Sequence, residues 1–277
     1  ICKINQSYKI MKIRILMLSI IGLMFFNSCS SDSNSSNSTS QNLDPNTILP
    51  KKIIRESELG GSSTSYEFYY NQNKLDHIHC FLFDNGYSVA EFDFNYTYNG
   101  NLISEINVID NSGDVYRKIE FSYLNSKLVN KKITDNNNSN IYYTEFNYTY
   151  NSSNDIITRN QTFDGNTTTI TDTFTIENNL IFKNNFGYNE GDYTFTSSPF
   201  KNIIGIKDAF IEGGLEFSQN SYLSGYFLND IFFSTTKNII RVGGANYVYI
   251  YNDIEFPTSV FIDIDSSDST IFQIFYQ

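Results

Sequence analysis

The sequence has few of the residues that mark several common protein classes. Its 277 residues include no Trp, two His and three Cys, and 19 basic residues stand against 30 acidic ones. The resulting formal net charge of −11 argues against nucleic-acid binding, because phosphates require a Lys/Arg-rich surface. It also disfavours electrostatic adsorption to anionic lipid.

Apolar runs are short, and one of them lies in a secretory signal. The first Met is Met11; Lys12 and Arg14 follow it, then an apolar run at residues 15–26 and the end Asn27-Ser28-Cys29. The run is too short for a comfortable membrane-spanning helix, and the layout is that of a signal peptide. Cys29 stands where a bacterial lipobox places its lipidated cysteine. An ordinary signal peptide with an incidental Cys is the alternative.

Three segments follow from this pattern. Residues 1–28 are expected to be upstream sequence and a lipoprotein signal peptide. Residues 29–50 are expected to be the lipidated Cys and a Ser/Asn-rich tether, since the stretch from Ser30 is almost free of apolar residues until Leu43. About twenty such residues have an r.m.s. span of roughly 25 Å. Residues 51–277 are expected to form the β domain, regular over 51–182 and looser over 183–277.

Cysteine is too scarce for a disulfide framework. Cys2 lies in the part expected to be removed and Cys29 would carry the lipid, which leaves Cys80 alone. A secreted domain without paired cysteines must draw its stability from its core. We therefore expect the domain to fold without a disulfide and without a cofactor.

Aromatic residues are abundant, with 24 Phe and 21 Tyr, and they follow a strand period. In residues 91–106 (EFDFNYTYNGNLISEI), Phe92, Phe94, Tyr96 and Tyr98 alternate with polar residues. Such alternation predicts a half-buried β-strand with its aromatic side inward. The Asn-Gly-Asn at residues 99–101 predicts a turn, and residues 102–109 predict the returning strand.

This hairpin is repeated along the chain. The residue that closes the outgoing strand recurs at Tyr70, Tyr98, Tyr123, Tyr150 and, in a degenerate copy, Ile176. The intervals are 28, 25, 27 and 26 residues, in the range typical of repeat architectures. We expect an all-β fold: an antiparallel meander of repeated hairpins in a large twisted or curved sheet, with few short helices. Residues 207–245 give no clear elements.

The repeated motif resembles two related groups of proteins. The Tyr-x-Tyr-Asn-x-x-Leu-Ile unit at residues 96–103 resembles the YD-type repeats of Rhs-like proteins. It more closely resembles uncharacterised Bacteroidota cell-envelope lipoproteins, which also carry a PF-K-N box, here residues 199–202, and a closing Y-x-x-D-x-x-P-T hairpin, to which residues 251–258 correspond with the Asp one position earlier, at Asp253. The resemblance covers roughly residues 51–277. It implies an antiparallel sheet of hairpins and no particular activity.

Few residues suggest a metal or modification site. His77 and His79 would share one face of a strand and reach one metal, with Cys80 on the other face. Without a recognisable third ligand, two exposed histidines are the simpler interpretation. Three carboxylates suggest Ca²⁺ ligands: Asp263, Asp265 and Asp268. They lack the spacing of a calcium loop, and a solvated face of a strand is the alternative. Ser269 lies in a short Asp-Ser-Thr match to a Bacteroidota O-glycosylation site.

No catalytic motif is present, so we expect a protein that is not an enzyme. The sequence contains no G-x-S-x-G, H-E-x-x-H, P-loop or dinucleotide fingerprint. The lack of Trp weakens a glycan-stacking platform, and most rings are expected in the core. We expect a membrane-anchored outer-membrane lipoprotein, periplasmic or surface-exposed, that acts as a structural or binding module. Its partners would be the lipid bilayer, through an N-terminal acyl (palmitate-type) anchor, and a surface glycan or envelope protein. A glycan-processing or glycan-binding accessory protein is the alternative.

Overall fold

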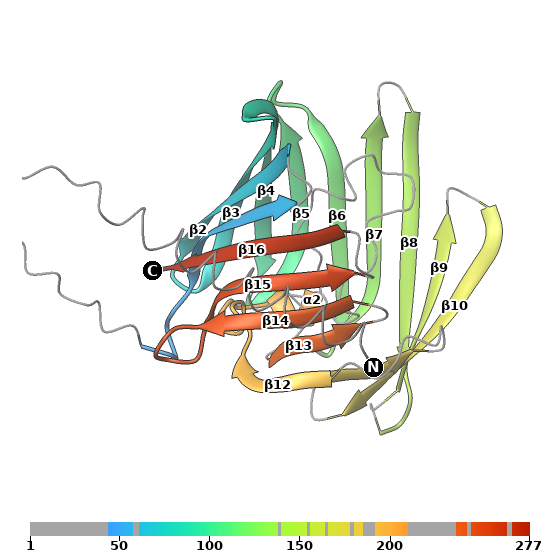
Figure 1. Cartoon of the computed structure of the whole chain (residues 1–277). Coiled ribbons are helices and arrows are strands. Elements are labelled where there is room, and N and C mark those ends of the chain that lie inside the picture. Colours follow the sequence, from blue (N-terminus) through green and yellow to red (C-terminus); the bar gives the residue numbers. More distant parts are fainter. Residues whose placement is uncertain are drawn as a thin grey trace, which may run out of the picture. The chain divides into compact units, whose positions relative to one another are not determined.

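The strands form one antiparallel sheet, as the alternation predicts. The computed structural model describes residues 44–57, 61–137, 140–153, 156–163, 166–177, 180–184, 192–209, 237–242, 245–264 and 268–277, all within the compact unit Leu43–Gln277. In this part the sheet has 16 strands in the order β11 to β1 and then β16 to β12. The expected all-β meander of hairpins is confirmed (Figure 1).

The first eleven strands follow one another in chain order: β1 (Pro50–Ser57), β2 (Ser62–Asn71), β3 (Lys74–Asp84), β4 (Tyr87–Asn99), β5 (Leu102–Asp110), β6 (Val115–Leu124), β7 (Lys127–Asn137), β8 (Asn140–Tyr150), β9 (Ile156–Phe163), β10 (Asn166–Glu177) and β11 (Leu180–Asn184). The remaining elements are β12 (Asp192–Ser197), the short helix α2 (Ile206–Ala209), β13 (Lys237–Val242), β14 (Ala245–Tyr251), β15 (Pro257–Ile264) and β16 (Asp268–Tyr276). The last strand, β16, pairs with the first, β1. The C-terminal strands therefore continue the sheet beyond β1 (Figure 1).

The hairpin β4–β5 has the predicted arrangement of faces. Phe92 and Phe94 are buried in the hydrophobic core, and Tyr96 and Tyr98 pack against it. Thr97, between the two tyrosines, is exposed. We call the side that bears these aromatics the core face and the opposite side the outer face. The assignment of faces from the sequence is confirmed for this strand.

A one-residue bulge recurs at the same place in the repeats. At four of the five closing residues the register shifts, and the residue six positions further along the chain, on the returning strand, is left without a partner. The hairpin closed by Tyr150 pairs without this shift. The extra residues are Asp76 after Tyr70, Ser104 after Tyr98, Val129 after Tyr123 and Phe182 after Ile176. Such a bulge bends the strand and increases its twist. The common position supports repetition of the hairpin itself.

The closing tyrosines also tie neighbouring hairpins together. The Tyr98 hydroxyl accepts a hydrogen bond from the Leu75 N–H (3.0 Å), and the Tyr150 hydroxyl donates one to the Leu128 carbonyl (2.9 Å). Leu75 and Leu128 each stand five residues after the closing tyrosine of the preceding hairpin. The Tyr123 hydroxyl is buried and has no hydrogen-bond partner within the described part of the chain.

The PF-K-N box and α2 fill one end of the core. Phe200 is buried, and its ring centroid lies 5.9 Å from that of Phe68. The Ile204 N–H donates to the Asn73 carbonyl (2.9 Å), and α2 packs against β5 and β7. Gly205 has φ +82°, and a Cβ there would lie 2.7 Å from the Asn101 carbonyl oxygen. A glycine is needed at this close approach.

Residues 44–49, which the sequence places in the tether, belong to the folded unit. Ile48 and Leu49 are buried, and the Asn202 side chain donates to the carbonyls of Pro45 (3.2 Å) and Ile48 (2.9 Å). Fixed structure thus begins before residue 51. Within the part of the chain that the structure describes, no helix has the length and hydropathy needed to cross a membrane.

Candidate binding site on the outer face

Strand β3 places both histidines on the outer face. Ile78 and Cys80 are buried on the core face, while the side chains of His77 and His79 are 32% and 25% exposed. The expectation that the two histidines share a face and that Cys80 points away is met. Cys80 is a free cysteine, and burial raises the pKa of its thiol.

A row of ionisable side chains crosses four strands, from Lys52 on β1 to Asp93 on β4. The register places Lys52 opposite Glu67, Glu67 opposite His79, and His79 opposite Asp93. Lys52 Nζ lies 3.0 Å from Glu67 Oε1, and His79 Nδ1 hydrogen-bonds to Asp93 Oδ1. The hydrogen bond from Lys52 holds the pKa of Glu67 below its usual value. Glu67 therefore stays ionised at neutral pH.

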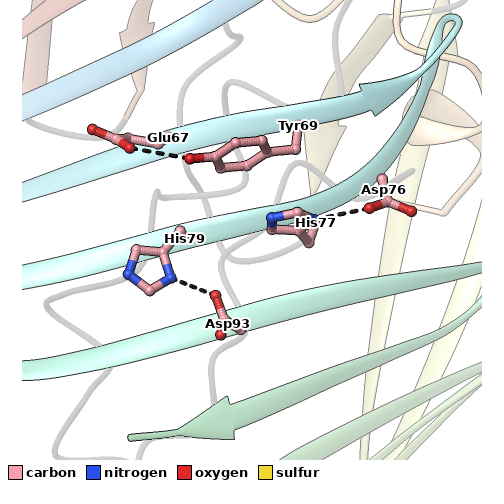
Figure 2. A network of polar contacts seen from close by, with 6 residues as sticks. All are labelled: Glu67, Tyr69, Asp76, His77, His79 and Asp93. Atoms are coloured by element: carbon pink, nitrogen blue, oxygen red, sulfur yellow. Dashed lines mark hydrogen bonds and ion pairs between the residues drawn. The ribbon is translucent and has the colours of Figure 1, made fainter.

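His77 lies in a stacked aromatic pair beside this row. Its ring is nearly parallel to that of Tyr69, with centroids 4.2 Å apart and an interplanar angle of 11°. The Tyr69 hydroxyl donates to Glu67 Oε2 (3.3 Å), and His77 Nδ1 lies 2.8 Å from Asp76 Oδ2. Asp76 is the extra residue of the repeated bulge. Figure 2 shows this network, with Tyr69 lying alongside Glu67.

Two more aromatic rings follow His79 along β3. The ring of His79 meets that of Phe81 edge-on with centroids 4.1 Å apart, and Phe83 follows at 6.3 Å from Phe81. Phe81 and Phe83 lie on the outer face, because Leu82 between them is buried in the core. We expected most rings in the core, and this strand departs from that. Here His79, Phe81 and Phe83 line the outer face while smaller residues face inward.

The two histidines do not converge on one position. Figure 2 shows His77 turned toward Asp76 and His79 turned toward Asp93. A carboxylate on Nδ1 leaves Nε2 as the atom able to bind a metal. Among the residues that the structure describes, no three His, Cys, Asp or Glu side chains lie close enough to hold a metal ion.

The other residues singled out in the sequence lie outside the described side chains. Cys29 and Asp265 are not among the described residues. For Asp263, Asp268 and Ser269 only the backbone is described. It places them in the hairpin β15–β16, with Asp263 opposite Ser269.

A second polar group lies on the core side and carries no sequence motif. Asp208 belongs to α2, and burial raises the pKa of its carboxyl. Burial is the main cause that raises the pKa of the Tyr123 hydroxyl, and the nearby Asp208 carboxyl raises it further. This pair was not singled out in the sequence. The two residues are 85 positions apart, so local patterns could not join them.

The pKa shifts of the described carboxyls bear on whether the outer face could carry out acid–base chemistry. Cleavage of a glycosidic bond needs a carboxyl that keeps its proton, hence one with a raised pKa, close to a second carboxylate. On the outer face the carboxylates with a shifted pKa, Glu67 and Glu105, are shifted downward, each chiefly by a lysine that donates to it. Asp208, whose pKa is raised, lies on the other side of the sheet.

Comparison with known proteins yields only distant matches. No protein-family model and no curated protein sequence matches the chain. The crystal structure of a porin-like protein from Bacteroides uniformis matches 82% of this chain and 96% of that chain, with a TM-score of 0.40 and 13% identity. A porin-like protein from Bacteroides vulgatus matches 83% of this chain and 99% of that chain, with a TM-score of 0.46 and 8% identity. TM-scores this low support no inference about this chain.

Proposed function

We propose that the chain is a membrane-anchored lipoprotein of the cell envelope whose β domain is a non-catalytic binding or structural module. The observation that carries the proposal is the order of segments before the domain. A basic pair, an apolar run of signal-peptide length and Cys29 are followed by a Ser/Asn-rich stretch that leads to the folded unit at Leu43. This order fits an acyl anchor on Cys29 that holds the domain near an outer-membrane surface.

The proposal that the β domain is a binding or structural module is supported by the continuity and the outer face of its sheet. Its 16 described strands are hydrogen-bonded neighbours. Among the residues that the structure describes, the outer face presents rings beside Glu67 and Glu105, whose pKa values are lowered. Such a surface binds or supports a partner without changing it covalently.

The anchor is tested by labelling cells with a fatty-acid probe and separating membrane from soluble fractions. The wild-type chain should carry the label and stay with membranes, because each buried CH₂ of an acyl chain contributes about 0.8 kcal/mol. Cys29→Ser should lose the label, whereas Cys80→Ala should keep it because Cys80 lies inside the core. An unlabelled wild-type chain would refute the anchor.

A second candidate function is glycan binding at the site on β2–β4. The observation that favours it is the stacked pair of Tyr69 and His77 beside the carboxylate of Glu67, which offers a ring face and hydrogen-bond acceptors together. Titration with a neutral glucan oligosaccharide tests it. Tyr69→Ala should abolish binding, and Tyr143→Ala, which removes an equally exposed tyrosine from β8, should not. Equal affinity of both variants would exclude this site.

A further inference from the structure

The PF-K-N box at residues 199–202 spans the seam where the first strand pairs with the last. On one side of the seam, the ring centroid of Phe200 lies 5.9 Å from that of Phe68 on β2. On the other side, Lys201 Nζ lies 5.2 Å from the centroid of the Phe256 ring, next to the start of β15. Strands β1 and β16 lie between β2 and β15 in the sheet. The box therefore joins two parts of the sheet across β1 and β16.

The same box holds the segment through which the chain enters the sheet. The Asn202 side chain donates to the carbonyls of Pro45 (3.2 Å) and Ile48 (2.9 Å). Ile48 and Leu49 are both buried. We call Asn202 together with residues 45–49 the entry clasp. It fixes the chain immediately before β1 begins.

Strand β1 is held along both of its edges. On one edge it pairs with β16, and Leu49 and Gln277 continue this pairing with two backbone hydrogen bonds (3.4 Å and 3.0 Å). On the other edge it pairs with β2, and the Tyr70 hydroxyl donates to the Pro50 carbonyl (2.8 Å). A pull on the entry clasp therefore meets hydrogen bonds on both sides of β1.

The direction of a pull decides how these hydrogen bonds share it. The bonds of an antiparallel ladder lie perpendicular to the strands, so a pull along β1 strains all of them together. Pro50 and Tyr276 lie opposite each other. A pull that separates these two residues opens the ladder from its end and strains one bond at a time. The strand should therefore resist the first kind of pull far more strongly than the second.

An anchored module transmits any pull on its partner to the tether. The tether enters the folded unit at the entry clasp, and β1 leads from there to the opposite end of the sheet. If the Asn202 hydrogen bonds were lost, residues 45–49 would leave the core one after another. The pull would then act on the open end of the ladder between β1 and β16.

We propose that the entry clasp and β1 form a mechanical attachment point, which keeps the domain folded when its anchor is pulled. Asn202 is the positioning residue, because it keeps residues 45–49 in place so that the pull reaches β1 along the strand. This inference rests on the proposed anchor at Cys29, through which the pull would act.

Single-molecule force spectroscopy on the full chain tests the effect of direction. One handle is attached to Cys29 in a Cys2→Ser background, and Cys80 stays unmodified because it is buried. The second handle is attached through Ser62→Cys, beside the far end of β1, or through Gln277→Cys, beside the entry. The unfolding force should be several-fold higher with the handle at residue 62. Equal forces in the two directions would overturn the inference.

Variants of two asparagines test the entry clasp itself. Asn202→Ala removes both hydrogen bonds to residues 45–49. With the second handle at residue 62, these residues should then come away in a separate early step of roughly 17 Å, at about 3.4 Å per residue. Asn202→Asp, which keeps the shape of the side chain and loses its N–H donor, should behave in the same way.

Asn136→Ala is the matched control. It also removes a hydrogen bond from an asparagine side chain to a backbone carbonyl, that of Val115 (2.8 Å), but on β7. The control should unfold without the early step. An early step in all of these variants, or in none of them, would overturn the role of Asn202. The comparison of directions keeps Asn202 and does not depend on how its variants fold.

Failure of the inference and failure of the anchor are distinguishable, because the force measurement needs no lipid. A chain that carries the fatty-acid label and unfolds at equal forces in both directions would refute the mechanical attachment point alone. An unlabelled chain whose unfolding force depends on direction would refute the anchor alone.

Discussion

The Tyr98 hydroxyl joins three segments that are distant in the chain, and Tyr98→Phe removes it while keeping the ring. The hydroxyl donates to the Ile204 carbonyl (3.2 Å) and accepts from the Leu75 N–H (3.0 Å). It thereby connects β4, the start of β3 and the loop before α2. The substitution should lower the free energy of unfolding.

The magnitude follows from the two hydrogen bonds. Each contributes about 0.5–1.5 kcal/mol net, and a buried donor left without a partner costs about 1–3 kcal/mol. Leu75 is fully buried, so its N–H gains no water in exchange. We expect a loss of about 2 kcal/mol for Tyr98→Phe. In a domain of this size that lowers Tm by roughly 4–8 °C.

Tyr123→Phe is the matched control, because Tyr123 closes the next hairpin and its buried hydroxyl has no partner in the described part of the chain. Its removal should leave stability unchanged or raise it slightly, since no hydrogen bond is lost. Urea denaturation and thermal melting of both variants measure the difference. Equal losses, or a larger loss for Tyr123→Phe, would refute the hydrogen-bond assignment.

Three further predictions concern the core, alkaline pH and metal ions. Phe94→Ala should cost roughly 3–5 kcal/mol of unfolding free energy, as large-to-small core changes do, and Thr97→Ala far less; similar losses in urea melts would contradict the assigned faces. Burial raises the pKa of Tyr98 and of Tyr247 to about 12. The folded chain thus keeps protons that the unfolded chain loses near pH 10, so stability should be full below pH 10 and fall as pH rises toward 12. A Tm that stays flat over that range would contradict this. EDTA should leave Tm unchanged, and a drop of many degrees that added Zn²⁺ or Ca²⁺ restores would show a metal site.

Local pattern predicted the strands and turns well, because alternation and turn chemistry act over a few residues. The alternation from Phe92 to Tyr98 placed β4 and its faces. The Asn-Gly-Asn after it predicted the turn, where Gly100 has a positive φ of 61°. These features need no knowledge of distant residues.

Contacts between segments that are distant in the chain could not be predicted from the sequence. The pairing of β1 with β16 joins the two ends of the domain, and Phe200 reaches Phe68 from more than a hundred residues away. Alternation also does not say which face is the inner one when both carry apolar residues, as at Phe81. Arg117 shows the reverse: it is charged yet fully buried, paired with Asp135 on β7.

The candidate site was predictable only in part, for a reason of register. The i, i+2 spacing placed His77 and His79 on one face. Their partners depend on how β2 and β4 align with β3, and a shift of one residue would move every side chain to the opposite face. The bulge at Asp76 shifts the alignment of β3 with β2, and a separate irregularity between Leu82 and Phe83 shifts its alignment with β4. Single-strand patterns therefore could not foresee the contact of His79 with Asp93.

Mass spectrometry of the N-terminal peptide of the membrane-bound chain tests the central claim most directly. The proposed anchor predicts a mature chain that begins at Cys29 and carries acyl groups on that residue. A mature chain that begins elsewhere, or a Cys29 with a free thiol, would contradict it.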